Sequence, residues 1–184
     1  INFNEPAIYV QMSNLFLEEK NMDKALEYLS LGREMFEDDQ SLLNAEINLY
    51  IQLGRTSELI QKLGEAIALD EENNLLYFNR GTIYDQQGDF TNAEKDYKFS
   101  LEIDPNVFSA NYNLGALYFN AAIKEKYGSK SANRLFDESF PYLEKAYLID
   151  PKDRNTLLSL KKLYYIKGNE EKEKEMKKLI AELK

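Results

Sequence analysis

The sequence contains no histidine and no cysteine, the side chains that most often act as general bases, nucleophiles and zinc ligands. Serine and threonine are present, but no motif places a lysine or a carboxylate beside one of them as a base. A disulfide framework is excluded because it requires cysteine. We therefore expect no catalytic residues, no enzyme activity and no cofactor.

The densest group of oxygen ligands is Asp70-Glu71-Glu72-Asn73-Asn74. Carboxylate and amide oxygens bind calcium, but this run lacks the alternating ligand positions and the central glycine of a calcium-binding loop. A glycine-rich phosphate loop is also absent from the sequence. We interpret the run as an exposed turn between helices and predict no metal site.

The negative charge is concentrated in the first part of the chain. Residues 1–73 contain 15 acidic and 5 basic side chains, whereas residues 74–184 contain 17 and 18, which gives the net charge of −9. Such a field repels phosphate backbones, so we expect no nucleic acid partner, and a basic protein segment suits the N-terminal end better. The alternative is a solvated surface, because runs such as Glu37-Asp38-Asp39 usually lie in exposed turns.

The organisation of the chain is clearest in residues 74–107, which predict two short amphipathic helices joined by a turn at Gly88-Asp89. One face of each helix carries small residues beside aromatic ones, at spacings of three and four. These residues are Tyr77, Gly81 and Tyr84 in the first helix, and Ala93, Tyr97 and Ser100 in the second. Small residues at a helix crossing let the two backbones approach closely.

The same pattern returns at a spacing of 34 residues. Steps of 34 from Tyr84 lead to Tyr50, Phe16 and Tyr118, from Gly81 to Gly115, and from Gly88 to Gly54. The run of Tyr77, Gly81, Tyr84, Gly88, Phe90, Ala93, Tyr97, Ser100 and Pro105 resembles the signature of the tetratricopeptide repeat, a 34-residue helix–turn–helix unit.

The resemblance implies an all-α fold, in which about five helix pairs stack into a right-handed superhelix. We expect a single array over residues 1–184. Its repeats would span residues 6–39, 40–73, 74–107, 108–153 and 154–184, the last acting as a polar C-terminal cap. No apolar run approaches the roughly 20 residues that a membrane-spanning helix needs, so we expect no membrane insertion.

The fourth repeat is longer than the others. Asp150-Pro151 follows Asp104-Pro105 by 46 residues, so 12 residues have been added to the period of 34. We expect an extended helical hairpin over residues 119–138, with about six added residues in each helix, Ser131 as the cap of the second helix, and a kink at Pro141. The hairpin is either a tolerated surface elaboration or a functional tip.

The resemblance also implies a concave groove, lined by residues of the first helix of each repeat. Carried over by position, the groove residues are Val10, Gln11, Asn14, Asn44, Asn48, Phe78, Asn79, Thr82, Tyr112, Asn113 and Phe119. Asparagine amides both donate to and accept from a peptide backbone, and aromatic rings add buried area. The alternative is that Asn79 and Asn113 are merely the usual polar residues at their positions.

The cations of a carboxylate clamp are missing from the groove. Members of this family that bind the acidic tails of heat-shock chaperones carry lysines and an arginine there. The corresponding positions of the first three repeats hold Val10, Asn14, Ala45, Leu75 and Asn79. We therefore expect no binding of such tails.

We predict a non-catalytic protein–protein interaction module that binds a peptide or helix of a partner in its groove. The alternative is a structural or assembly segment of a larger protein, such as a cell-envelope protein. Ile1 corresponds to the last apolar residue of the second helix in later repeats, so we expect a piece of a longer protein or a processed product. The location would be cytoplasmic or exported to the periplasm. A missing upstream neighbour would expose apolar surface near Tyr9 and Met12, which predicts self-association through the N-terminal end.

Overall fold

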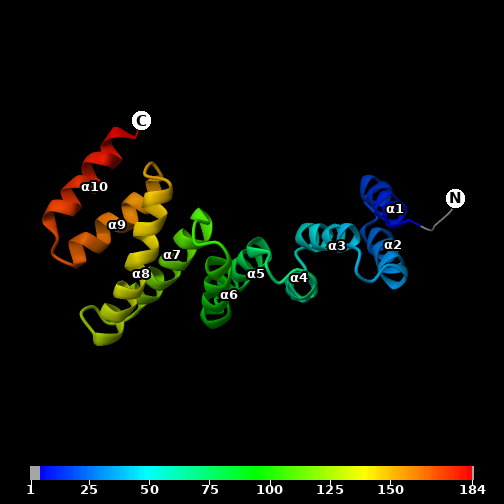
Figure 1. The fold of residues 1–184 in the computed structure, drawn as a ribbon, viewed down its shortest axis with the longest axis horizontal. Coiled ribbons are helices and arrows are strands. Elements are labelled where there is room, and N and C mark those ends of the chain that lie inside the picture. The colour runs from blue at the N-terminus through cyan, green and yellow to red at the C-terminus, as the bar shows by residue number, and fades with distance from the viewer. Residues whose placement is uncertain (1–4, 184) are drawn as a thin grey trace. The chain divides into compact units, whose positions relative to one another are not determined.

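The structure is a computed structural model, which describes residues 5–183. These residues form ten α-helices and contain no strand, which confirms the all-α prediction (Figure 1). The helices are α1 (Pro6–Glu18), α2 (Met22–Met35), α3 (Gln40–Leu53), α4 (Thr56–Leu69), α5 (Asn74–Gln86), α6 (Phe90–Ile103), α7 (Phe108–Lys124), α8 (Lys130–Ile149), α9 (Arg154–Ile166) and α10 (Glu170–Glu182). Ile1, from which we predicted an upstream helix, lies outside the described residues.

The chain divides into two compact units, Ile1–Leu76 and Tyr77–Lys184. The first, unit 1, contains α1 to α4, and the second, unit 2, contains most of α5 and the helices α6 to α10. Within each unit, sequential helices pack against each other, most extensively α1 on α2 and α7 on α8. The single superhelical array over residues 1–184 stays a prediction.

Polar side chains define where five of the helices begin. In each case an asparagine or aspartate accepts a hydrogen bond from the backbone N–H three residues later, which satisfies a donor that the first helical turn leaves free. These caps are Asn21, Asp39, Asp89, Asp153 and Asn169. The turn after α3 uses Gly54 at φ 65°, a left-handed conformation that glycine adopts without a steric cost.

Close approach between paired helices is confirmed in unit 2. A Cβ atom built at Gly81 would lie 3.0 Å from the ring of Tyr97, whose side chain is fully buried. Ala93 and Ser100 are also fully buried on α6. At Gly115 of α7, a Cβ atom would lie 2.7 Å from the Leu143 side chain of α8. The small residues therefore set the distances at which α5 meets α6 and α7 meets α8.

The added residues of the fourth repeat lengthen both of its helices, but unequally. Helix α7 has 17 residues and α8 has 20, against 13 in α5 and 14 in α6. The helices are thus four and six residues longer, and the remaining addition lies in the turn between Lys124 and Lys130. Helix α8 runs through Pro141 without a break.

The cap of α8 is Ser129, and our prediction of Ser131 was wrong. Ser129 has the extended backbone that a cap requires, and its hydroxyl accepts a hydrogen bond from the N–H of Ala132 at 3.1 Å. Ser131 lies within the first turn of the helix and is exposed.

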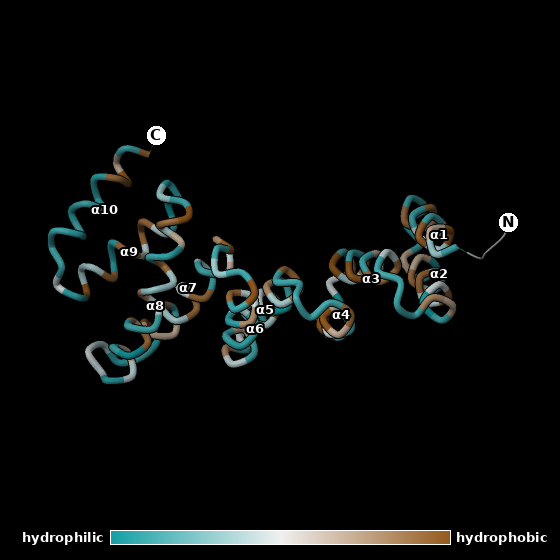
Figure 2. Tube along the Cα trace, viewed as in Figure 1, coloured by the Kyte–Doolittle hydropathy of each residue, from teal (hydrophilic) through white to brown (hydrophobic). Residues whose placement is uncertain are grey.

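Each unit has a hydrophobic core between its helices, and most helices carry both apolar and polar residues along their length (Figure 2). Tyr9 lies in the core of unit 1 and is only 5% exposed, because Phe36 and Gly32 pack against its ring. The exposed apolar surface that we predicted at Tyr9 is therefore not observed. Of the helices within residues 5–183, none combines the length and the apolar composition that crossing a membrane would require.

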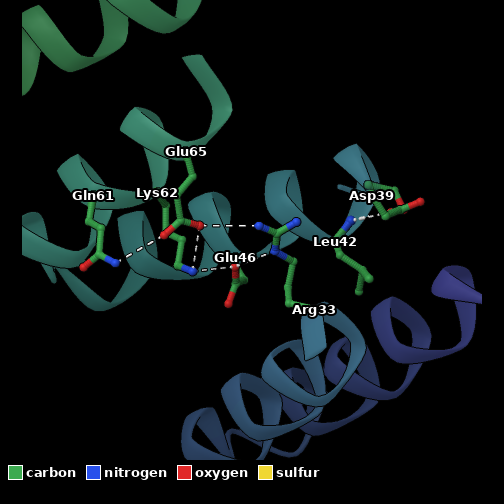
Figure 3. A network of polar contacts seen from close by, with 8 residues as sticks. Arg33, Asp39, Leu42, Glu46, Gln61, Lys62 and Glu65 are labelled. Atoms are coloured by element: carbon green, nitrogen blue, oxygen red, sulfur yellow. Dashed lines mark hydrogen bonds and ion pairs between the residues drawn. The ribbon is translucent and has the colours of Figure 1, made fainter. Parts of the chain in front are cut away.

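A buried ionic cluster joins three helices of unit 1, and the sequence analysis did not identify it (Figure 3). Glu46 of α3 is only 2% exposed, and its carboxylate lies 3.2 Å from the Lys62 ammonium of α4 and 3.6 Å from Arg33 Nε of α2. Glu65 lies 3.0 Å from Lys62 and 3.4 Å from Arg33. Because a buried carboxylate is costly without cations, the cluster constrains how these helices meet.

We expect the ionic cluster to make unit 1 sensitive to acid. Burial raises the pKa of Glu65, but the hydrogen bond and charge of Lys62 outweigh it and hold the pKa below the ordinary value of 4.5. The stability that Glu65 contributes is therefore complete above 4.5, where unfolded glutamate is ionised, and is lost as the pH falls through the lower folded pKa. In urea unfolding, Glu65→Gln should be less stable near pH 7 and should lose less stability on going to about pH 3.

The matched control for Glu65→Gln is Glu71→Gln, at an exposed carboxylate in the turn after α4. This substitution removes the same charge away from the cluster, and its unfolding curves should follow those of the parent. Equal acid sensitivity of the Glu65 variant and the parent would contradict the role of the cluster.

We expect Gly115→Ala to destabilise unit 2 by about 1 to 3 kcal/mol. The new methyl group would lie 2.7 Å from Leu143 Cγ and 3.2 Å from the Leu143 backbone nitrogen, so α7 and α8 must separate. This overpacking should outweigh the gain of roughly 1 kcal/mol that alanine has over glycine in a helix. Ser109→Ala, at an exposed site on α7, should change the unfolding free energy by less than about 0.5 kcal/mol. A Gly115→Ala variant as stable as the parent would show that the crossing is not tight.

Candidate functional site

Unit 1 contains a groove of about 650 Å³ between α1 and α3, the first helices of the first two repeats. The two helices pack against each other, and the groove runs along the surface that both share. The side chains that lend it its chemical character are Val10, Asn14 and Leu17 of α1, with Asn44, Asn48 and Ile51 of α3.

These lining residues occupy equivalent positions in successive repeats. Asn14 and Asn48 are 34 residues apart, as are Leu17 and Ile51. Asn44 lies one helical turn before Asn48, and its counterpart on α1 is Val10. The structure therefore brings together three of the predicted groove residues, Asn14, Asn44 and Asn48, on one surface.

The three amides are available to a ligand. Asn14, Asn44 and Asn48 are exposed, and within residues 5–183 their side chains make no hydrogen bond to another group of the chain. Each amide can both donate and accept. Their hydrogen-bonding capacity is thus used neither for capping nor for packing.

The groove carries no charged side chain among its lining residues, which are amides, hydroxyls and aliphatic groups. This neutrality contrasts with the excess of acidic residues elsewhere in the same part of the chain. The groove is therefore suited to groups that are polar but uncharged, such as peptide units, and to small apolar side chains.

In unit 2, the predicted groove residues surround a buried tyrosine. The Tyr97 hydroxyl lies 3.4 Å from Thr82 Oγ1 and 3.5 Å from Asp85 Oδ2, either of which can accept its proton, and it accepts a hydrogen bond from Asn113 Nδ2 at 3.3 Å. Burial raises the pKa of Tyr97, which keeps the hydroxyl protonated. Thr82 donates to the Phe78 carbonyl at 2.9 Å. Thr82 and Asn113 are therefore engaged within the chain, whereas Asn14, Asn44 and Asn48 are not.

The predicted aromatic groove residues take part in packing. Phe78 is half-buried with its ring centroid 6.0 Å from that of Tyr97, and Tyr112 is half-buried and stacked on Phe108 at 6.2 Å. Asn79 is exposed on α5.

Phe119 does not line the surface of a groove. It is only 7% exposed and packs against Phe136, with 5.5 Å between the ring centroids. The lengthened α8 supplies Phe136, so the added residues of the fourth repeat convert this groove position into a core position.

Unit 2 also contains a charged hollow of about 370 Å³, whose lining includes Asp85, Asn120 and Lys124. Burial raises the pKa of Asp85, against the opposing effects of Tyr97 and Lys124. The sequence analysis missed these residues, although counting would have found them. A step of 34 from the groove residue Ile51 leads to Asp85, and two steps from Gln52, which also lines the groove of unit 1, lead to Asn120.

We expect Tyr97→Phe to destabilise unit 2 by about 1 kcal/mol in urea unfolding. The substitution keeps the buried ring and removes the hydroxyl to which Asn113 donates and from which Thr82 or Asp85 accepts. The matched control is Tyr165→Phe, whose side chain is largely exposed and which should change the unfolding free energy by less than about 0.5 kcal/mol. Equal effects of the two substitutions would mean that the Tyr97 hydroxyl contributes nothing specific.

Residues 75–107 match the family model of the tetratricopeptide repeat. The chain is 30% identical over 103 residues to the photosystem I assembly protein Ycf3 of Acaryochloris marina, covering 53% of this chain and 62% of Ycf3. It is 27% identical over 109 residues to tetratricopeptide repeat protein 6 of Homo sapiens, covering 59% of this chain and 18% of that protein. The chain thus spans less than two thirds of the length of these relatives.

Solved structures share the fold at low sequence identity. The crystal structure of MamA has a TM-score of 0.76 and 17% identity, covering 97% of this chain and 91% of MamA. YrrB, described as a tetratricopeptide repeat protein with an unusual peptide-binding site, has a TM-score of 0.71 and 18% identity, covering 100% of this chain and 88% of YrrB. At these identities the likeness shows the fold alone. The matching repeat, the named relatives and the fold together identify the chain as a tetratricopeptide repeat protein.

Proposed function

We propose that this chain is a non-catalytic protein-binding module, and that the groove between α1 and α3 holds an extended peptide segment of a partner protein. The observation that carries the proposal is the row of three exposed amides, Asn14, Asn44 and Asn48, which make no hydrogen bond to the rest of residues 5–183. A tetratricopeptide repeat array supports protein–protein interaction as its general role.

The spacing of the amides matches the repeat of an extended peptide. Asn44 and Asn48 are four residues apart on α3, which places them about 6 Å apart along the helix axis at 1.5 Å per residue. An extended chain advances about 6.6 Å in two residues. Successive amides can therefore reach alternate peptide units of one ligand, donating to a carbonyl and accepting from an N–H.

The remaining lining favours ligand side chains without charge. Val10, Leu17 and Ile51 supply aliphatic surface beside the amides. Burial of small apolar side chains there would add to the binding free energy, at roughly 25 cal/mol per Å² of apolar area. Because the lining has no ionic group, binding at this groove should depend little on salt.

Similar proteins lend this proposal support. YrrB shares the fold and is described as having an unusual peptide-binding site. Ycf3, the relative from Acaryochloris marina, is named an assembly protein for photosystem I. Both descriptions fit a chain whose groove binds another protein rather than transforming a small molecule.

The second candidate is a structural or assembly segment of a larger protein. It is favoured by the turn between α7 and α8, where Ile123 and Tyr127 are strongly exposed and lie away from the groove of unit 1. In this case the contacts would involve the outer surfaces of the helices, and substitutions in the groove would leave assembly unchanged.

We expect the triple substitution of Asn14, Asn44 and Asn48 by alanine to weaken peptide binding at least about tenfold while leaving the unfolding free energy within about 1 kcal/mol of the parent. The amides are exposed and make no internal bond in the described part of the chain, so their loss should cost little stability. Peptides selected from a displayed random library on the immobilised chain would be titrated against parent and variant by calorimetry.

The matched control replaces the exposed asparagines Asn133 and Asn155 of unit 2 by alanine. This variant should bind the selected peptides as the parent does. Methylation of alternate backbone nitrogens in the peptide should also weaken binding, because it removes the N–H groups that the amides accept. Selected peptides that bind the triple variant as tightly as the parent would place the binding site elsewhere.

A further inference from the structure

The turn between α7 and α8, here called the tip, presents apolar side chains within a basic rim. Ile123 is 58% exposed and Tyr127 is 78% exposed. Around them lie four exposed cationic side chains and one exposed carboxylate. The cations are Lys124, Lys126, Lys130 and Arg134, and the carboxylate is Glu125.

The charges of the tip contribute little to the stability of the fold. Within residues 5–183, no ion pair involves Lys126 or Lys130. Lys130 is the first residue of α8, at the positive end of the helix dipole, where a cation is unfavourable. These lysines therefore carry charge that no neighbour in the described chain neutralises.

The tip is ordered by its own hydrogen bonds. The Ser129 hydroxyl caps α8 at Ala132, and the Ser129 N–H donates to the Lys126 carbonyl at 3.0 Å. Gly128 completes the turn at φ 75°. Tyr127 is therefore held in an exposed position on a defined turn, which lowers the entropy lost when it binds.

The outer face of α2 in unit 1 has the complementary character. Leu31 is 42% exposed and Met35 is 56% exposed, one helical turn apart. Four exposed carboxylates surround them, and within residues 5–183 none of the four forms an ion pair. These carboxylates are Glu27, Glu34, Glu37 and Asp38.

The carboxylates of this face are also placed unfavourably for the fold. Glu34 lies in the last turn of α2, and Glu37 and Asp38 follow directly after the helix. The C-terminal end of a helix carries partial negative charge, which favours cations and disfavours carboxylates. The nearby cation Arg33 is directed to Glu46 and Glu65 in the buried cluster. A basic partner on this face would relieve the repulsion.

We propose that the α7–α8 tip of one copy of this chain docks on the outer face of α2 in a second copy. Tyr127 and Ile123 would cover Leu31 and Met35, and the basic rim of the tip would meet the carboxylates around α2. The two surfaces are matched in both respects that guide association, because each has a small apolar centre and their rims carry opposite charge.

The contact is heterologous, since it joins two different surfaces. Each copy that uses its tip still has a free α2 face, so association continues into a ring or an open chain. The proposal does not depend on the groove between α1 and α3, and failure of either would leave the other standing.

The test is charge reversal on each side of the contact in the full chain. Variant one carries Lys126→Glu and Lys130→Glu, and variant two carries Glu34→Lys and Asp38→Lys. In sedimentation velocity at about 50 mM salt, the parent should associate as its concentration rises, and each variant alone should associate at least about tenfold more weakly. An equimolar mixture of the two should associate again, because each variant then meets a surface of opposite charge.

The control variant carries Lys152→Glu and Lys177→Glu, which change the net charge equally at exposed sites away from the tip. It should associate like the parent. Raising the salt to about 500 mM should weaken the parent's association, since the screening length then falls below about 5 Å.

Three outcomes would overturn the proposal. They are a parent that stays monomeric at every concentration, a mixture of the two variants that stays as dissociated as each variant alone, and a tip that binds anionic lipid vesicles while the chain does not self-associate. The second outcome includes the case in which tip and α2 face meet within a single molecule, because mixing would then restore nothing.

Discussion

The structure depends on the close contact between the two helices of a repeat. At Gly81 and Gly115 a single methyl group would collide with Tyr97 or Leu143, so the helix axes are held near one another by the absence of a side chain. This contact faces the interior of each pair. The residues one position away on the first helix are thereby turned outward, which is how exposed amides come to lie beside a tightly packed core.

The two units use equivalent positions in different ways. In unit 1, Asn14 and Asn48 are left without internal partners and line a neutral groove. In unit 2, the next equivalent of Asn48 is Thr82, which is drawn into the hydrogen bonds around Tyr97. A tyrosine that reaches from the second helix to the first thus converts a free polar surface into an internally satisfied one. The same repeat supports a ligand surface in one unit and a polar brace in the other.

Much of the fold could be predicted because it depends on local spacing. Small residues at intervals of three and four, capping side chains and turn glycines each act within one helix pair, and the amide row followed from counting in steps of 34. Contacts that join distant segments could not be predicted in this way. The burial of Phe119 requires the phase of α8 after an irregular insertion, and the environment of Glu46 requires the mutual orientation of three helices. Ser129 differs from Ser131 only in which residue adopts the extended backbone.

The ionic cluster around Glu46 has a consequence for the inheritance of the groove. An apolar contact between α2, α3 and α4 would be at least as stabilising, because replacing a buried ion pair by well-packed hydrophobic side chains is often neutral or favourable. Apolar packing, however, is not directional, whereas Glu46 must point at both Arg33 and Lys62. The carboxylate therefore fixes the rotation of α3 about its own axis, and with it the direction of Asn44 and Asn48. Sequence drift that substitutes leucine for these charges would preserve a folded protein while releasing the groove from its orientation.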